Sequence, residues 1–324
     1  MDRWPRVLLG VAISVAAAAL LVVTTDLGQV ADRLRQAQVV WLAPALLVLA
    51  AQAWVRAARW ASLIRPSVDR AVRAAQVLDA MLVGYFVNAV LPGRLGEVAR
   101  ALVVSRREAV AFSGVAASVV VERAVDVMAL AALASLALAL TGSDWALPFA
   151  GLAAAIGVVV GLGSRAPLLA RLVPSRTPAR VAEGIRGFLG SVAAIRLPVL
   201  AGAAGLSAVA WLGDSVLVLL VSRALGLEVS FAAAVAIGLG GSLGTALPAA
   251  PGYLATYELG AVTLGGFAGV PRETVLPLAI LTHVIGVTVL AVSGAIALGR
   301  LGGLVRLDAL LGASRLSAAS DQRR

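Results

Sequence analysis

The chain of 324 residues contains no cysteine, no lysine and only one histidine, His283. The absence of cysteine excludes disulfides, thiolate chemistry and cysteine-ligated metal sites. A single histidine argues against a histidine-based metal site and against a Ser/His/Asp relay, and neither a Walker A sequence nor a His-Glu-x-x-His pair occurs. The sequence therefore predicts no enzyme active site, no metal site and no cofactor.

Charged residues are also scarce, at 14% of the chain, whereas hydrophobic residues make up 60%. Many uncharged runs are long enough to cross a bilayer. The formal net charge of +10 would suggest nucleic-acid binding if position were ignored, but the arginines cluster between apolar runs with hardly any aromatic residue among them. We therefore expect an all-α, polytopic membrane protein that does not bind nucleic acid.

Two apolar segments are interrupted where a membrane helix would otherwise continue. Residues 88–97 contain Leu-Pro-Gly followed by a cation and an anion, and residues 247–258 contain Leu-Pro, then Pro-Gly, then a glutamate. Proline cannot donate a backbone hydrogen bond, and irregular backbone at membrane depth survives only where protein or a water-filled cavity surrounds it. We expect each interruption to be the turn of a re-entrant helical hairpin. The residues expected to break the helices or act as hinges are Pro92, Gly93, Pro248, Pro251 and Gly252.

The two Leu-Pro pairs lie close to half the chain length apart, which indicates an internal duplication. Arginine falls mainly on one side of the predicted spans, so the positive-inside rule places both termini in the cytoplasm. Each half then reads span, span, broken hairpin, span, with opposite orientations. This inverted-topology repeat gives about six full spans plus two re-entrant hairpins. The predicted spans are residues 7–25, 39–64, 109–140, 145–164, 197–222 and 274–299. The arginines that fall on the predicted outer side of the membrane are Arg33, Arg35, Arg223 and Arg272.

A single membrane domain is expected over residues 1–324, with a first half at 1–142, a second half at 143–306 and a cytoplasmic tail at 307–324. The second span ends in Arg56, Arg59 and Arg65, with Trp54 and Trp60 beside them. Cationic and aromatic residues gather at the ends of membrane spans. These side chains are therefore expected to mark the cytoplasmic boundary.

Arg94, Glu97 and Arg100 follow the first break at intervals of three, so a helix that begins near Arg94 places them along one face. Two arginines flank one glutamate close to a helix N-terminus, whose free N–H groups also favour an anion. The phosphate of a phospholipid suits such a net positive site. The alternative is that Glu97 neutralises both arginines and holds the hairpin together.

Glu122 and Asp126 share one face of the next span, with Arg123 able to reach Asp126. A centrally placed charge costs about 2.5–3.5 kcal/mol on insertion scales, so these side chains should face the protein interior. Arg94 and Arg100 are their natural partners. The group either contributes to a substrate site or forms a scaffold of ion pairs without substrate contact.

Glu258 corresponds to Glu97 in the second hairpin but has no arginine nearby. It is expected to be solvated in a cavity, protonated, or paired with His283 on the following span. His283 is either part of a proton-linked pair or a hydrogen-bonded packing residue. Asp79 and Asp214 are single acids within apolar helices, and hydrogen bonding between helices accounts for each.

The glycine-rich string at residues 238–244 has glycine spacing like that of a dinucleotide-binding loop, but no βαβ unit surrounds it. Small residues in an apolar helix instead predict close contact with a neighbouring helix.

Three ordered motifs resemble those of a known family. They are Asn88…Leu91-Pro-Gly-Arg-Leu-Gly-Glu97 with Arg100, Val121-Glu-Arg-Ala-Val-Asp126, and Leu247-Pro…Pro251-Gly-Tyr-Leu…Glu258. They look like the marks of the lysylphosphatidylglycerol synthase transmembrane-region family, a flippase-like domain that also forms the membrane half of the bacterial multiple peptide resistance factor. The third motif departs from the family's glycine-rich form, with Tyr253 and Ala255 where glycine is common.

The resemblance implies that a phospholipid or lipid-linked substrate moves between the leaflets of the bacterial plasma (inner) membrane. Expected partners are an anionic or aminoacylated phospholipid or a polyprenyl-linked lipid. The soluble aminoacyl-transferase half of the family is missing, so synthesis of an aminoacyl lipid by this chain alone is not implied. The residues that the resemblance places in or near the substrate cavity are Arg94, Glu97, Arg100, Glu122, Arg123, Asp126 and Glu258.

One alternative belongs to a different functional class. The chain would then be a non-transporting membrane partner that binds a lipid or a polyprenyl-phosphate sugar for a separate enzyme. The sequence is compatible with a partner enzyme and with a homo-oligomer.

Overall fold

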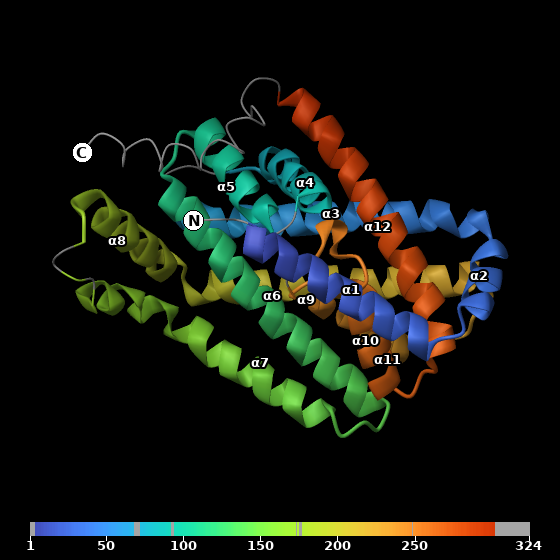
Figure 1. Cartoon of the computed structure of the whole chain (residues 1–324). Helices are drawn as coiled ribbons and strands as arrows, with labels where there is room; N and C mark the ends of the chain where they lie inside the picture. Colours follow the sequence, from blue (N-terminus) through green and yellow to red (C-terminus); the bar gives the residue numbers. More distant parts are fainter. Residues whose placement is uncertain are drawn as a thin grey trace.

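The computed structural model describes residues 4–67, 72–91, 94–172, 174, 177–247 and 249–301. These residues form α-helices and short 3-10 helices, and no strand occurs in the described part of the chain (Figure 1). The prediction of an all-α chain is confirmed.

The same order of helices occurs twice along the chain. An apolar helix is followed by a second, separate helix, a long apolar helix, two helices on either side of a break, and another long helix. In the first half these are α1 (Trp4–Thr24), α2 (Leu27–Arg35), α3 (Leu42–Ile64), α4 (Ala74–Val90), α5 (Leu95–Glu108) and α6 (Phe112–Leu140). In the second half they are α7 (Ala146–Gly161), α8 (Ala179–Ala194), α9 (Leu197–Ala224), α10 (Phe231–Gly244), α11 (Thr256–Phe267) and α12 (Arg272–Arg300). The 3-10 helices are η1 (Val39–Trp41), η2 (Arg65–Ser67), η3 (Leu162–Leu172) and η4 (Pro251–Tyr253).

Four of the described helices are long and apolar enough to cross a membrane: Val39–Ile64, which joins η1 to α3, and α6, α9 and α12. They coincide with four of the six predicted spans. The predicted first span is α1, which bends by 93° into α2 and counts as a fifth span only if the pair is taken together. The span predicted at 145–164 contains α7, whose 16 residues reach about 24 Å, short of a hydrocarbon core of roughly 30 Å.

Two apolar cores are each built around one broken helix pair. In the first, α4 and α5 pack with the C-terminal parts of α3 and α12, around buried residues such as Trp60 and Met81. In the second, α10 and α11 pack with α9, the early part of α3 and the N-terminal part of α12, around Ile237 and Leu278. Helices α3 and α12 therefore contribute to both cores and connect the two hairpins.

Glycines allow the two arms of each hairpin to touch through their backbones. A Cβ atom added at Gly96 in α5 would lie 2.0 Å from the carbonyl oxygen of Gly84 in α4. A Cβ atom added at Gly260 in α11 would lie 2.2 Å from the carbonyl oxygen of Gly240 in α10. No side chain fits at such distances, so only glycine permits this packing. The prediction of close helix contact through residues 238–244 is confirmed.

The same string contains Gly-x-Ser-x-Gly spacing at Gly240, Ser242 and Gly244. A nucleophilic serine in such a motif needs a strained turn from a strand into a helix. Here the string lies within α10, and the Ser242 hydroxyl donates to the carbonyl oxygen of Gly238 at 3.1 Å. The spacing therefore belongs to helix packing.

Replacing Gly260 by alanine tests the backbone contact between α10 and α11. The added methyl group must push the two helices apart, and overpacking of this kind costs about 1–3 kcal/mol. We expect Gly260→Ala to lower the Tm measured in detergent by circular dichroism. Gly266→Ala on the same helix is the matched control, because its Cβ atom would meet open space. Since alanine is also the better helix former, the control should keep or raise the Tm. Equal Tm values for the two variants would contradict the close packing.

Candidate functional site

A cavity of about 220 Å³ lies where the two hairpin breaks meet. Arg94 and Glu97 reach it from the first break, and Gly252 and Tyr253 reach it from the second. Helices α3, α4, α6, α9 and α12 complete its wall. The two interrupted segments singled out in the sequence therefore contribute to one site.

Both breaks contain residues in the left-handed backbone conformation. The φ angle is 56° at Arg94, which immediately precedes α5, and 58° and 66° at Tyr253 and Ala255 before α11. Each such non-glycine residue costs of the order of 1–3 kcal/mol and persists where the surrounding structure fixes it. Gly252, with φ 69°, adopts this region without strain. Of the predicted hinge residues, Pro251 and Gly252 lie in the second break, whereas Pro92, Gly93 and Pro248 lie outside the described residues.

Arg94 joins the two hairpins directly. Its guanidinium donates a hydrogen bond to the backbone carbonyl of Thr245 at the end of α10, and it lies 5.9 Å from the centre of the Tyr253 ring. The sequence predicted Glu122 and Asp126 as its partners, and the structure gives it a neutral carbonyl from the other half of the chain.

Asn88 organises the start of α5. Its amide oxygen accepts a hydrogen bond of 2.7 Å from the Gly96 N–H, and its amide nitrogen donates to the Glu97 carboxylate at 3.3 Å. The described contacts of the Glu97 carboxylate are therefore with Asn88, and neither Arg94 nor Arg100 forms an ion pair with it in the described part of the chain. Glu97 remains half-buried at the cavity wall.

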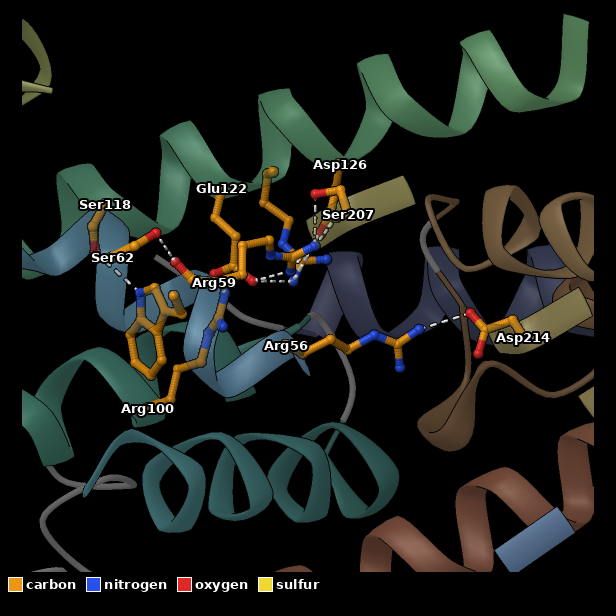
Figure 2. A network of polar contacts seen from close by, with 11 residues as sticks. Arg56, Arg59, Ser62, Arg100, Ser118, Glu122, Asp126, Ser207 and Asp214 are labelled. Carbon is orange, nitrogen blue, oxygen red and sulfur yellow. Dashed lines mark hydrogen bonds and ion pairs between the residues drawn. The ribbon is translucent and has the colours of Figure 1, made fainter. Parts of the chain in front are cut away.

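A buried network of charges lies beside the cavity, and Figure 2 shows it. The Arg59 guanidinium from α3 donates to Glu122 at 2.5 Å, to Asp126, and to the hydroxyl of Ser207 on α9 at 2.9 Å. Arg100 from α5 lies 2.8 Å from the second oxygen of Glu122. Arg59 is 1% exposed and Glu122 is fully buried, so these charges are withdrawn from solvent and lipid. The network ties α3, α5, α6 and α9 together.

The burial of Arg59 and Trp60 was not predicted. The sequence places them at a cytoplasmic boundary, but Trp60 is completely buried and its indole N–H donates to Ser118 at 3.0 Å. The reason is that this face of α3 packs against α6 and α9, which the distribution of charge along one span does not reveal. A signal was present: Glu122 and Asp126 needed cations, and Arg59 belongs to a neighbouring apolar span.

Arg56 and Asp214 form a second bridge between α3 and α9 that sequence reasoning did not include in the site. Their side chains lie 2.7 Å apart, and the Arg56 guanidinium lies 5.2 Å from the centre of the Trp211 ring. Both members of the ion pair line the cavity. The prediction that Asp214 bonds to another helix is confirmed, and its partner is Arg56. Asp79, the other single acid, lies 3.6 Å from Arg107 on α5.

The predicted substrate residues separate into two groups. Arg94, Glu97, Arg123 and Asp126 line the cavity. Those that do not are Arg100, Glu122 and Glu258. Arg100 is held away from the cavity because Glu122 binds its guanidinium and the Trp60 ring lies 4.4 Å below it. Arg123 is the more available cation, since its side chain is 39% exposed and its carboxylate neighbours lie 3.6 and 3.8 Å away.

Glu258 pairs with His283, one of the three alternatives that the sequence left open. The carboxylate oxygen lies 2.7 Å from Nδ1 of the imidazole, and Tyr257 stacks on the ring with 4.3 Å between ring centres. His283 lines the cavity, and Glu258 lies behind it.

The lining of the cavity carries more positive than negative charge. Four arginines face it, against three carboxylates, and the remaining titratable groups are tyrosines and His283. Buried charges of one sign in a low-dielectric wall attract a ligand of the other sign. The arrangement therefore favours an anionic ligand. Among the described residues no group of three or more His, Asp or Glu side chains is placed to hold a metal ion.

Comparison with known protein families shows that residues 7–294 match the Lysylphosphatidylglycerol synthase TM region. No curated protein and no solved structure matches the chain.

Removing the Arg59 guanidinium tests the network. Arg59→Met leaves Glu122 and Asp126 buried without their central cation, and breaking a buried ion pair in this way costs about 3–5 kcal/mol. We expect a large fall in Tm in detergent. Arg35→Met on the exposed face of α2 is the control, because that side chain is 80% exposed and its ion pair contributes little. Adding Glu122→Gln and Asp126→Asn to Arg59→Met should recover part of the lost Tm, and no recovery would show that charge pairing is not what stabilises this region.

Proposed function

The chain belongs to the Lysylphosphatidylglycerol synthase TM region family, and on that premise we propose that it is a flippase-like protein that moves an anionic phospholipid or lipid-linked substrate between leaflets. The observation that carries the proposal is the meeting of two hairpin breaks, one from each half, at a cavity with an excess of arginine. Interrupted helices at matching places in two halves are typical of transport sites. The bacterial plasma membrane is the proposed location, with both termini in the cytoplasm.

The size of the cavity supports binding of a headgroup rather than of a whole lipid. Its 220 Å³ lie below the roughly 300–1,000 Å³ of pockets that enclose a drug-sized ligand. A headgroup phosphate with its immediate substituents would occupy this space while the acyl chains stay in the bilayer. Such a division removes the main barrier to lipid exchange, which is the transfer of charge through hydrocarbon.

Arg94 and Arg123 are the proposed phosphate ligands. Arg94 donates to a neutral carbonyl, whereas a phosphate carries full negative charge and can bind two N–H groups of the guanidinium at once, so a phosphate would displace Thr245 from it. Arg123 has only long contacts to Glu122 and Asp126 and is partly exposed. Arg59, by contrast, is bound by two carboxylates at short range and has the role of a scaffold.

Movement of one half against the other is the proposed route to alternating access. The repeated order of helices supports an inverted-topology repeat with re-entrant hairpins that enter from opposite faces. The bond from Arg94 to the Thr245 carbonyl crosses between the halves and would break and re-form as they move. Phosphate binding and release of this bond are thereby coupled, because both use the same guanidinium.

The transport proposal predicts that Arg94→Ala strongly slows lipid exchange in proteoliposomes. Fluorescent phosphatidylglycerol placed in one leaflet is followed by quenching with dithionite. Loss of a charge-assisted hydrogen bond worth about 1.5–3 kcal/mol corresponds to a fall in exchange rate of ten- to a hundredfold. Arg33→Ala on the exposed face of α2 is the matched control and should exchange lipid at the wild-type rate.

Two results would contradict transport. Binding of phosphatidylglycerol without exchange by the wild type would instead support the non-transporting partner that supplies a lipid to a separate enzyme. Equal exchange by wild type and Arg94→Ala would remove the proposed site.

The inverted repeat predicts that the bases of the two hairpins lie on opposite sides of the membrane. The chain has no native cysteine, so the labelling of a single-cysteine variant has no background from other cysteines. Ala111→Cys, in the connection from α5 to α6, should react with a membrane-impermeant maleimide only from the cytoplasmic side. Glu228→Cys, before α10, should react only from outside. Both positions are exposed. Labelling of both from the same side would refute the inverted arrangement.

A further inference from the structure

The pair formed by Glu258 and His283 has polar atoms that the fold leaves unsatisfied. His283 is 6% exposed, and its Nε2 atom has no hydrogen-bond partner among the described residues. The hydroxyl of Thr282, the preceding residue, is buried and unpartnered in the same way. Both residues line the cavity. Buried polar atoms are nearly always hydrogen-bonded, so two unpaired atoms on one wall of a cavity indicate where a polar ligand binds.

The surroundings of the imidazole fix which atom is available. Nδ1 faces the Glu258 carboxylate at 2.7 Å, and the Tyr257 ring is stacked on one face at an angle of 19°. Nε2 is therefore the polar atom of His283 that remains available to a ligand in the cavity. A carboxylate that holds Nδ1 orients the ring and sets the behaviour of the opposite nitrogen.

The pair has two states that present opposite hydrogen-bonding character to a ligand. One proton between Nδ1 and the Glu258 oxygen leaves the pair with one negative charge, and Nε2 is then an acceptor. A second proton, taken from water onto the lone pair of Nε2, makes the pair neutral overall and turns Nε2 into a donor. A phosphate oxygen needs a donor and is repelled by a negative pair. An anionic headgroup therefore binds the state that carries the second proton.

The charged groups on the neighbouring helices are already paired, so the role of hydrogen-bond donor to the headgroup falls to His283. Asp214 from α9 is bound by Arg56 from α3 at 2.7 Å. The titratable groups on the elements packed around His283 that share its cavity are Tyr85 of α4, Tyr257 of α11, Arg56 and Asp214, with Glu258 behind the ring. None of them donates to Nε2 in the described part of the chain.

We propose that His283 is a headgroup ligand whose protonation is coupled to binding, so that one proton enters the cavity with each anionic headgroup and leaves with it. Thr282 supplies a second donor beside it, and Glu258 is the positioning residue that holds the imidazole. This inference rests on the proposed function, because it concerns the ligand of the same cavity. It also gives lipid movement an energy source, because a proton gradient across the membrane would bias its direction.

Proton uptake on binding is measured directly by isothermal titration calorimetry. The whole chain in phosphatidylcholine nanodiscs is titrated with short-chain phosphatidylglycerol at pH 7.5, in buffers of low and high ionisation enthalpy. The change of binding enthalpy with buffer ionisation enthalpy gives the number of protons taken up. We expect close to one proton per headgroup in the wild type, with affinity falling as the pH is raised because binding takes up a proton.

The variants separate a proton-linked ligand from a packing residue. His283→Gln keeps a hydrogen-bonding side chain without a titrating group, so it should still bind phosphatidylglycerol through the arginines, with proton uptake near zero and no pH dependence. Glu258→Gln should reduce the uptake as well. Glu273→Gln, on the exposed first turn of the same helix, is the control and should keep the wild-type value.

The outcomes distinguish this inference from the proposed function. Wild-type binding without proton uptake, or undiminished uptake in His283→Gln, would overturn the role of His283 and leave the headgroup site intact. If the wild type neither binds phosphatidylglycerol in nanodiscs nor exchanges it in proteoliposomes, the proposed function fails, and the proton-linked ligand fails with it.

Discussion

The burial of the Arg59 guanidinium among Glu122, Asp126 and Ser207 is the interaction on which the rest of the structure depends. It joins three helices that are far apart in the sequence, and Arg100 extends it to a fourth. Charges at this depth are tolerated only when each one is paired, so the positions of α3, α5, α6 and α9 relative to one another are closely constrained. Because α5 is one arm of the first hairpin, the same network sets where the first break lies.

The cavity follows from this constraint. With α5 held by Arg100 and Glu122, Arg94 is carried to the end of α10 and meets the Thr245 carbonyl of the second hairpin. Glycines bring the arms of each hairpin into backbone contact, which leaves room between the hairpins rather than within them. Arg56 and Arg59 line the cavity with their guanidiniums bound by carboxylates at short range. Arg94 and Arg123, which have weaker or longer contacts, are the cations left for a ligand.

Local features of the sequence predicted the broken helices well. Proline, glycine and a charge within an apolar run are sufficient to place a break, and the described ends of α4 at Val90 and of α10 at Gly244 agree with it. Spacing along a helix also predicted that Glu122 and Asp126 face inward, that Arg100 is one of their partners, and that His283 is one candidate partner of Glu258. Each of these inferences needs only helical periodicity or the cost of an unpaired charge.

Other features depend on contacts between distant parts of the chain and were not predictable from one sequence. An arginine near the end of a span looks like a membrane boundary, and only the packing of α3 against α6 and α9 shows that Arg59 is central. Helical spacing gave Arg94 and Arg100 the same role, but the Trp60 ring and Glu122 remove Arg100 from the cavity. About six full spans were predicted, whereas four described helices, or five with the bent pair α1 and α2, are long and apolar enough to cross. Hydropathy does not register the bend after α1 or the early end of α7.

The central claim is that the cavity between the hairpins opens in turn to each side of a membrane. Ser242 lines this cavity, and its hydroxyl bonds only to the carbonyl of its own helix among the described residues. Reactivity of Ser242→Cys toward an impermeant thiol reagent, compared between right-side-out and inside-out vesicles, tests the claim most directly. The account predicts labelling from both sides, with phosphatidylglycerol slowing it in each case. A cysteine that reacts from neither side, in a protein that remains folded, would show a sealed interior and contradict the account.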